Sequence, residues 1–284
     1  MFLVVIILKV SGLRLNILAL ETSSQHCSVA LQYTDSQPAE STIKVITRLD
    51  ATALSHSRSL LSLIDDVLKE ANLSLAELDA IAVARGPGSF TGLRIGIAVA
   101  QGLAFGNQLP VLPISSLAAV AYNAFLYWDK QTNSIPAASR QAVLATMDAR
   151  MGEVYCGWYD LRGELPVLLG NEHVIKPSLL SKVGRPCLVK ADTSQAHIVI
   201  DNIDSSLALT SVIAGQGLHY HEEFPLSLSR LPLELELELE LELELEMLPD
   251  AAALLPLATR DLTLGLGVDP EALTPVYLRD NVTY

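Results

Sequence analysis

Cysteine, aromatic residues and basic residues are all scarce in this sequence. The 284 residues include three cysteines, and the aromatic residues make up 5% of the chain. Cys27, Cys156 and Cys187 are odd in number and widely spaced, which excludes a disulfide framework and a zinc-binding motif. We therefore expect a protein of a reducing compartment, the cytoplasm.

Basic residues are outnumbered by acidic ones, 19 to 32, and the net charge is −13 at pH 7. Seven glutamates lie in a leucine–glutamate repeat between Leu233 and Glu246, and without them the net charge is −6. Unaided binding to a nucleic-acid backbone needs clustered Lys and Arg, so we do not expect it here. The repeat is of low complexity and its carboxylates repel one another, which predicts a solvated loop or a loose edge strand.

The N-terminal hydrophobic run is too short to cross a membrane. Phe2–Leu8 holds seven apolar residues and lacks both a basic start and a small-residue cleavage site. We expect residues 1–13 to form an extension ahead of the first core strand, and no membrane contact. Half of the residues are hydrophobic, and the length suffices for one large domain or two modest lobes.

A glycine-rich segment, Arg85–Gly96, is the most informative motif. It follows an apolar strand, and Pro87 stiffens it, while Ser89 and Thr91 are candidate N-caps of the helix that follows. Amide groups at the start of that helix can face an anion, so the segment is either a phosphate cradle or a simple loop-to-helix turn. A Walker loop is excluded, because the Lys-Ser/Thr pair is missing after Gly92.

Hydrophobic periodicity predicts a mixed α/β chain. The expected strands are 15–20, 27–33, 42–47, 80–84, 142–148 and 153–160, and the expected helices are 60–71, 92–105, 116–127 and 250–264. Ser74 and Glu77 form a capping box that predicts a further short helix. The order of elements and the strands near both lobe starts predict a two-lobed α/β fold.

Small residues recur every four positions along the helix at 92–105. Gly92, Gly96, Ala100 and Ala104 form a smooth ridge along which another element can approach closely. Glycine costs about 1 kcal/mol relative to alanine in a helix, so close packing must offset that cost. The ridge is consistent with tight packing inside its own domain and with a subunit interface, and the sequence leaves both open.

Four separated segments stand in the order found in the TsaB (YeaZ) family. They are Ile17–Ser23, Arg85–Gly96, Asp148–Tyr155 and Pro275–Arg279. The chain resembles this family except in its first dozen residues and the leucine–glutamate repeat. The resemblance implies an α/β actin-like ATPase fold, the class of actin and the sugar kinases, with two lobes of which the second is reduced. The expected divisions are an extension at 1–13, a first lobe at 14–112, a second lobe at 113–230, an insertion at 231–247, and a C-terminal helix and tail at 248–284.

The resemblance also implies partners. TsaB-type proteins pair with TsaD, which transfers a threonylcarbamoyl group to the adenosine next to the anticodon in tRNAs reading codons that begin with A. An ATPase, TsaE, docks on the pair, tRNA is met through the complex, and the isolated TsaB-type chain tends to form a homodimer. The implied interface with TsaD lies on two helices and comprises His56, Leu60, Leu63, Ile64, Val67, Gly92, Gly96, Ala100 and Ala104.

Several residues match positions that contact nucleotide in this fold class. They are Thr22, Ser23, Gly86, Gly88, Ser89 and Asp148. We expect no tightly bound cofactor and, at most, weak ATP or ADP contact at the interface with TsaD. The alternative is that these residues serve only as turn and cap residues.

TsaD-like proteins carry a metal-binding His-x-x-x-His pair after the glycine-loop helix, and this sequence lacks it. The corresponding stretch, Pro113–Val120, contains no histidine, and serine and alanine do not replace imidazole ligands. We therefore expect no metal site and no catalytic residues, and predict a scaffold subunit that activates TsaD. The alternative is a self-sufficient actin-fold ATPase or kinase, or a metallopeptidase-like enzyme.

Overall fold

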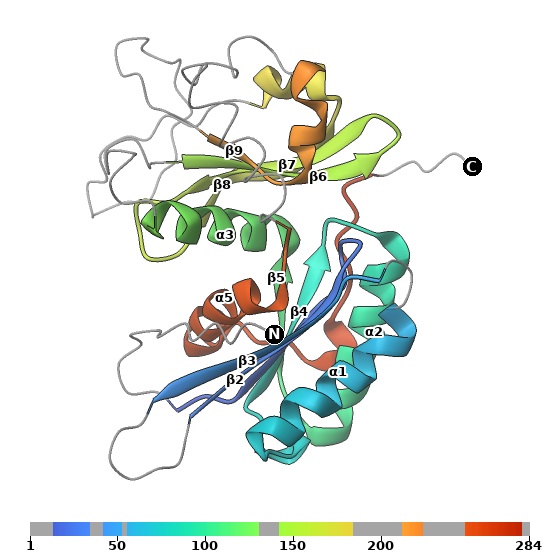
Figure 1. The fold of residues 1–284 in the computed structure, drawn as a ribbon, viewed down its shortest axis with the longest axis vertical. Helices are drawn as coiled ribbons and strands as arrows, with labels where there is room; N and C mark the ends of the chain where they lie inside the picture. The colour runs from blue at the N-terminus through green and yellow to red at the C-terminus, as the bar shows by residue number, and fades with distance from the viewer. Residues whose placement is uncertain are drawn as a thin grey trace. The chain divides into compact units, whose positions relative to one another are not determined.

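The computed structural model describes residues 14–34, 42–52, 56–130, 142–183, 212–223 and 248–279 (Figure 1). The chain forms two compact units. The first comprises Met1–Ala119 and Pro249–Tyr277, and the second comprises Val120–Leu248 and Leu278–Tyr284. The C-terminal helix thus belongs to the first unit, whereas we predicted from the sequence a separate C-terminal helix and tail at 248–284.

The first unit is built on a five-stranded sheet with the order β3-β2-β1-β4-β5. Its strands are β1 (Ile17–Glu21), β2 (Cys27–Thr34), β3 (Ile43–Asp50), β4 (Ala80–Gly86) and β5 (Val111–Ser115). The first three strands form an antiparallel meander, and β1, β4 and β5 run parallel. All five residues of β1 are buried, as expected for a central strand covered on both faces. The carboxyl ends of the three parallel strands therefore meet at one edge of the sheet.

Helices cover both faces of this sheet. α1 (His56–Ala71) and α2 (Phe90–Asn107) pack on one face, and α5 (Ala251–Thr263) packs on the other (Figure 1). α1 and α2 contribute leucine, isoleucine, valine and alanine side chains to a core shared with β1, β2 and β4. α3 (Ser116–Lys130) follows β5 directly, and two single 3-10 turns, η1 (Leu75–Glu77) and η5 (Pro270–Ala272), connect the elements.

The second unit contains a four-stranded sheet with the order β8-β7-β6-β9. Its strands are β6 (Ala142–Arg150), β7 (Glu153–Asp160), β8 (Val167–Ile175) and β9 (Val212–Ala214), with two 3-10 helices, η3 (Pro177–Lys182) and η4 (Gln216–Glu223). β6 and β7 form an antiparallel hairpin. The core of this unit is packed around Trp158, which is 2% exposed and donates its indole N–H to the Val183 carbonyl oxygen at 3.2 Å.

The elements predicted from periodicity are present, with boundaries that differ by a few residues. α2 begins at Phe90, two residues before the predicted start, and the short helix after Ser74 is a single 3-10 turn. The two described cysteines, Cys27 and Cys156, are free and buried. The N-terminal extension, Cys187 and the leucine–glutamate repeat lie outside the described residues. No helix among the described residues is both long and apolar enough to cross a membrane.

Candidate functional site

The turn after β1 and the glycine-rich loop after β4 are joined directly. Thr22 donates its hydroxyl to the Gly92 carbonyl oxygen at 2.8 Å, and Ser89 donates its amide to the Ser23 carbonyl oxygen at 2.7 Å. Ser89 Oγ in turn accepts the Gly92 amide at 3.2 Å, so Ser89 is the N-cap of α2 and Thr91 lies inside the helix. The sequence motifs Ile17–Ser23 and Arg85–Gly96 therefore form one packed corner at the carboxyl edge of the sheet.

Glycine is required in this corner because the β1 turn leaves no space for a side chain. A Cβ atom on Gly92 would lie 2.0 Å from the Thr22 carbonyl oxygen, and one on Gly88 would lie 2.4 Å from the Ser23 carbonyl oxygen. A Cβ atom on Gly96 would lie 2.3 Å from Thr22 Oγ1. These glycines therefore serve close backbone approach within the chain itself.

Most of the predicted interface residues pack against the core of the first unit, and their contact with a partner stays a prediction. Ala100 and Ala104 are fully buried in the first unit's core, and Gly92 and Gly96 are buried against Thr22. The inward-facing set is Leu60, Ile64, Val67, Gly92, Gly96, Ala100 and Ala104. The small-residue ridge thus packs inside its own domain, the first of the two alternatives that the sequence left open. Leu63 is partly buried against the same core, and α1 begins at His56.

The outward faces of α1 and α2 carry a different set of apolar and small residues. Leu61 of α1 is 56% exposed and Phe105 of α2 is 66% exposed. Ala98, Gly102 and Gly106 are also exposed and recur every four residues along α2. A Cβ atom on Gly102 or Gly106 would meet no described residue within 4 Å, so packing among the described residues does not require glycine at either position. We call these five residues the outer helix face.

Glu21 is a buried acid that sequence reasoning did not single out as a site residue. It ends β1, is fully buried, and accepts the Ser23 amide with one carboxylate oxygen, while the other has no partner among the described residues. Burial, with a smaller contribution from the negative charge of Asp250, raises the pKa of Glu21 to about 7. The sequence feature that could have identified Glu21 is its position as a glutamate at the end of an otherwise apolar central strand.

Asp250 is the N-cap of α5, the helix whose first turn lies beside the end of β1. Its carboxylate accepts the Ala253 amide at 2.9 Å and caps the helix, while the Ala251 amide is donated to Ser28 Oγ at 2.9 Å. Ser28 is the cross-strand partner of Glu21. The acid at the end of β1 is thus enclosed by the turn, by β2 and by the first turn of α5.

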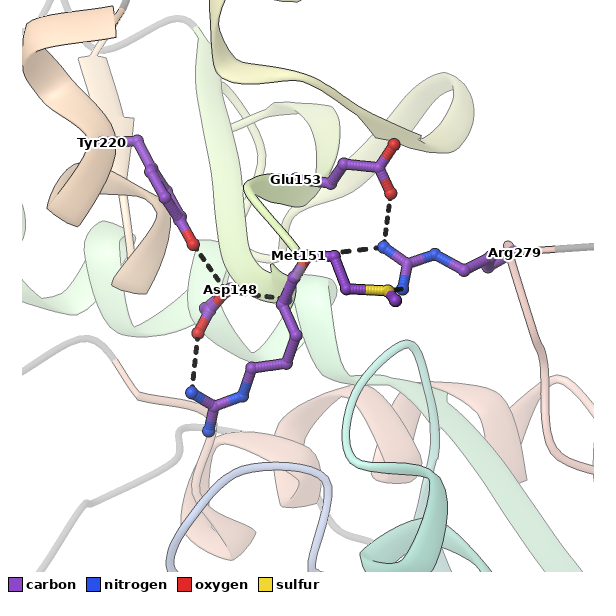
Figure 2. A network of polar contacts seen from close by, with 6 residues as sticks. Asp148, Met151, Glu153, Tyr220 and Arg279 are labelled. Atoms are coloured by element: carbon purple, nitrogen blue, oxygen red, sulfur yellow. Dashed lines mark hydrogen bonds and ion pairs between the residues drawn. The ribbon is translucent and has the colours of Figure 1, made fainter. Parts of the chain in front are cut away.

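Asp148, the remaining predicted nucleotide-contact residue, lies in the second unit (Figure 2). Its carboxylate accepts the Tyr220 hydroxyl at 3.1 Å and the Arg150 amide at 2.7 Å, and it pairs with the Arg150 guanidinium at 3.1 Å. Thr22 and Ser23, in the first unit, are 0% and 2% exposed and engage the protein's own backbone. Nucleotide contact by Thr22, Ser23, Gly86, Gly88, Ser89 and Asp148 stays a prediction.

The junction of β5 and α3, where TsaD-like proteins are expected to carry metal ligands, holds two serines. Ser115 Oγ accepts the amides of Leu117 at 3.1 Å and Ala118 at 3.3 Å, so it starts α3 as a capping residue. Ser116 is fully buried. No cluster of three histidine, cysteine or acidic side chains suited to a metal ion occurs in the described part of the chain. The residues present at this junction do not fit a catalytic divalent metal.

A family model described as TsaD, tRNA N6-adenosine threonylcarbamoyltransferase, matches residues 50–231. The tRNA threonylcarbamoyladenosine biosynthesis protein TsaB of Escherichia coli is 33% identical over 272 residues, which cover 95% of this chain and 97% of that protein. The chain belongs to the TsaB family. TsaB proteins bear the name of tRNA threonylcarbamoyladenosine biosynthesis, and this chain is therefore placed in that process.

Further relatives agree with the TsaB assignment. TsaB of Haemophilus influenzae is 43% identical over 142 residues, which cover 50% of this chain and 52% of that protein. The structure of YeaZ from Pseudomonas aeruginosa covers 92% of this chain and all of its own, with 33% identity and a TM-score of 0.66. The predicted TsaB (YeaZ) family and the predicted actin-like ATPase fold are confirmed.

Proposed function

We propose that the chain is a non-catalytic subunit that pairs with TsaD and activates it for threonylcarbamoyl transfer to tRNA. The observation that carries the proposal is the junction of β5 and α3 in a chain of the TsaB family. The stretch Pro113–Val120 at this junction contains no histidine, and Ser115 is already used as a helix cap. A chain that shares the fold of a metal-dependent transferase without its ligands is suited to support the enzyme rather than to replace it.

The partner surface that we propose is the outer helix face, Leu61, Ala98, Gly102, Phe105 and Gly106. Glycine in a helix interior is about 1 kcal/mol less favourable than alanine, and no residue in the described part of the chain fills the space beside Gly102. Close approach of a helix from another subunit accounts for a glycine at this position. The exposed Leu61 and Phe105 side chains supply the apolar area that stable interfaces bury.

The same surface accounts for the other proposed associations. A chain that exposes this face in the absence of TsaD would cover it with a second copy of itself, which gives a homodimer. In the complex, TsaE docks on the pair, tRNA is bound by the assembly, and weak ATP or ADP contact occurs at the interface with TsaD. The acidic net charge of the chain fits a subunit that meets tRNA through its partners.

Titration calorimetry with purified TsaD tests the pairing. We expect tight binding by the native chain and loss of binding by Gly102→Trp, because the indole would occupy the space that a closely packed partner helix would need. Gly163→Trp is the matched control, since Gly163 is an exposed glycine in the second unit, and it should bind TsaD as the native chain does. Unchanged affinity of a folded Gly102→Trp variant would overturn the surface assignment.

Titration of the chain alone with ATP and with zinc separates the scaffold from an enzyme. A scaffold subunit is expected to bind neither tightly without TsaD. Tight binding of either ligand by the isolated chain would favour the alternative, a self-sufficient ATPase, kinase or metallopeptidase-like enzyme.

A further inference from the structure

We propose that Arg94, held by the Phe90 ring and the Tyr277 hydroxyl, binds a carboxylate of the partner that covers the outer helix face. This role of Arg94 rests on the proposed pairing with TsaD and adds a residue that selects which partner is accepted. All three residues belong to the first compact unit. Phe90 and Tyr277 are 46% and 41% exposed and Arg94 is exposed, so the cluster is open to a partner.

Two contacts fix the guanidinium of Arg94. Its Cζ atom lies 3.8 Å from the centre of the Phe90 ring, and its Nε donates to the Tyr277 hydroxyl at 3.1 Å. The centres of the Phe90 and Tyr277 rings are 5.3 Å apart, within the range of favourable aromatic contact. A side chain that is already ordered loses less conformational entropy when it binds a partner.

The segment that carries Tyr277 is itself anchored to the first unit. Gln101 of α2 donates its side-chain amide to the Leu273 carbonyl oxygen at 3.1 Å, and the Leu273 side chain is buried in the core shared with α2. The Val276 amide is donated to the Arg85 carbonyl oxygen at 2.8 Å. The residues before Tyr277 therefore hold its hydroxyl at the start of α2.

The terminal nitrogens of Arg94 have no carboxylate partner in the described part of the chain. Other arginines pair with an Asp or Glu side chain of the chain itself: Arg48, Arg150, Arg162, Arg260 and Arg279. While Tyr277 engages Nε of Arg94, Nη1 and Nη2 still form a planar fork, which matches the two oxygens of a carboxylate. Arg94 is thus ordered within the chain, and its charge is left for a group from outside.

An Asp or Glu side chain of a protein partner suits this fork better than RNA does. Phe90, Arg94 and Ala98 are spaced four residues apart along α2, so the cluster continues the outer helix face on the same side of the helix. A phosphate also matches a guanidinium, but binding to an RNA backbone needs clustered basic residues. Arg94 is the only basic residue of α2. A partner packed on the outer helix face would therefore supply the carboxylate.

Calorimetric titration of full-chain variants with purified TsaD measures the contribution of Arg94. Arg94→Met keeps an apolar side chain of similar reach and loses the charge, so we expect its affinity to be at least about tenfold lower than that of the native chain. Arg94→Lys keeps the charge without the fork and should give an intermediate affinity. Arg162→Met is the matched control, because it removes an exposed arginine of the second unit and should bind as the native chain does.

The salt dependence of binding separates a charge pair from a packing defect. Added sodium chloride should weaken binding by the native chain more steeply than binding by Arg94→Met. Native-like affinity of a folded Arg94→Met variant, or equal salt dependence of the two proteins, would overturn the role of Arg94. Should Arg94→Met fail to fold, Arg94→Lys decides: reduced affinity supports the fork, and native-like affinity contradicts it.

Failure of the pairing itself has a different signature. If the native chain does not bind TsaD, the pairing is refuted and the role of Arg94 with it. If the native chain binds and Gly102→Trp does not, while Arg94→Met binds normally, the pairing stands and only the role of Arg94 is refuted. Binding of a single-stranded RNA oligonucleotide that depends on Arg94 would also contradict the proposal, because it would assign the fork to phosphate.

Discussion

Replacement of the buried acid at the end of β1, Glu21→Gln, should remove a pH dependence from the stability of the chain. Burial raises the pKa of Glu21 from its ordinary value of 4.5 to about 7, with Ser23 opposing the rise and Asp250 adding to it. A difference of about 2.5 between the folded and unfolded pKa, at about 1.4 kcal/mol for each pH unit, amounts to about 3 kcal/mol.

The sign follows from which state binds the proton more tightly. Because the pKa is higher in the folded state, protonated Glu21 contributes stability that is fully present below pH 4.5. That contribution is lost as the pH rises through about 7. The charged group that acts on Glu21 is Asp250, the N-cap of α5, and burial raises the pKa of nearby Cys27 on β2 to about 12. Cys27 therefore stays neutral over this range.

Urea unfolding of the native chain and of Glu21→Gln between pH 4.5 and 7.5 measures the effect. Glutamine cannot ionise and keeps an oxygen that accepts the Ser23 amide, so the native chain should lose about 3 kcal/mol relative to the variant across this range. Glu77→Gln is the control. Hydrogen bonds from Ser74 lower the pKa of exposed Glu77, so its contribution is lost as the pH falls, the opposite direction. A pH-independent difference between the native chain and Glu21→Gln would show that the pKa of Glu21 is not raised in the folded chain.

Two further predictions concern glycines of α2 and the leucine–glutamate repeat. Gly92→Ala should destabilise the chain by about 2 kcal/mol or more, because its Cβ atom would meet the Thr22 carbonyl oxygen, whereas Gly102→Ala should stabilise it by about 1 kcal/mol. Urea titrations measure the free energy of unfolding of both variants. Equal changes would contradict the placement of Gly92 on the inner face of α2 and Gly102 on its outer face. Deletion of Leu233–Glu246 should leave TsaD binding and tRNA modification intact, and calorimetry with a modification assay would expose any loss of either.

The fold could be predicted from the sequence because the central strands are strongly apolar and the four family motifs stand in a fixed order. Local chemistry limited the cap of α2 to Ser89 or Thr91, and the structure shows that Ser89 is the cap. The solvent-exposed face of α2 could not be predicted from the sequence. Gly96 and Gly102 look alike in sequence and differ only in which residues lie beside them. Gly96 faces Thr22, a residue 74 positions earlier in the chain, whereas no described residue lies within 4 Å of a Cβ atom placed on Gly102.

The unpredicted parts of the site depend on contacts between residues far apart in the chain. The pKa of Glu21 depends on its enclosure by α5, and the position of the Arg94 guanidinium depends on Tyr277, 183 residues later in the chain. Periodicity reports which face of an element is apolar, but it does not report which distant polar groups meet there. Pro275–Arg279 was informative as part of a family pattern, and its contacts with Arg85, Arg94 and Glu153 came from the structure.

A reconstituted transfer assay measures whether the chain activates TsaD without catalysing the transfer itself. Unmodified tRNA and the threonylcarbamoyl adenylate are incubated with the chain alone, with TsaD and TsaE, and with all three proteins, and threonylcarbamoyladenosine is quantified. We expect no product with the chain alone, and product formation by TsaD and TsaE that depends on adding the chain. Transfer by the chain alone, or full activity without it, would contradict the proposed scaffold role.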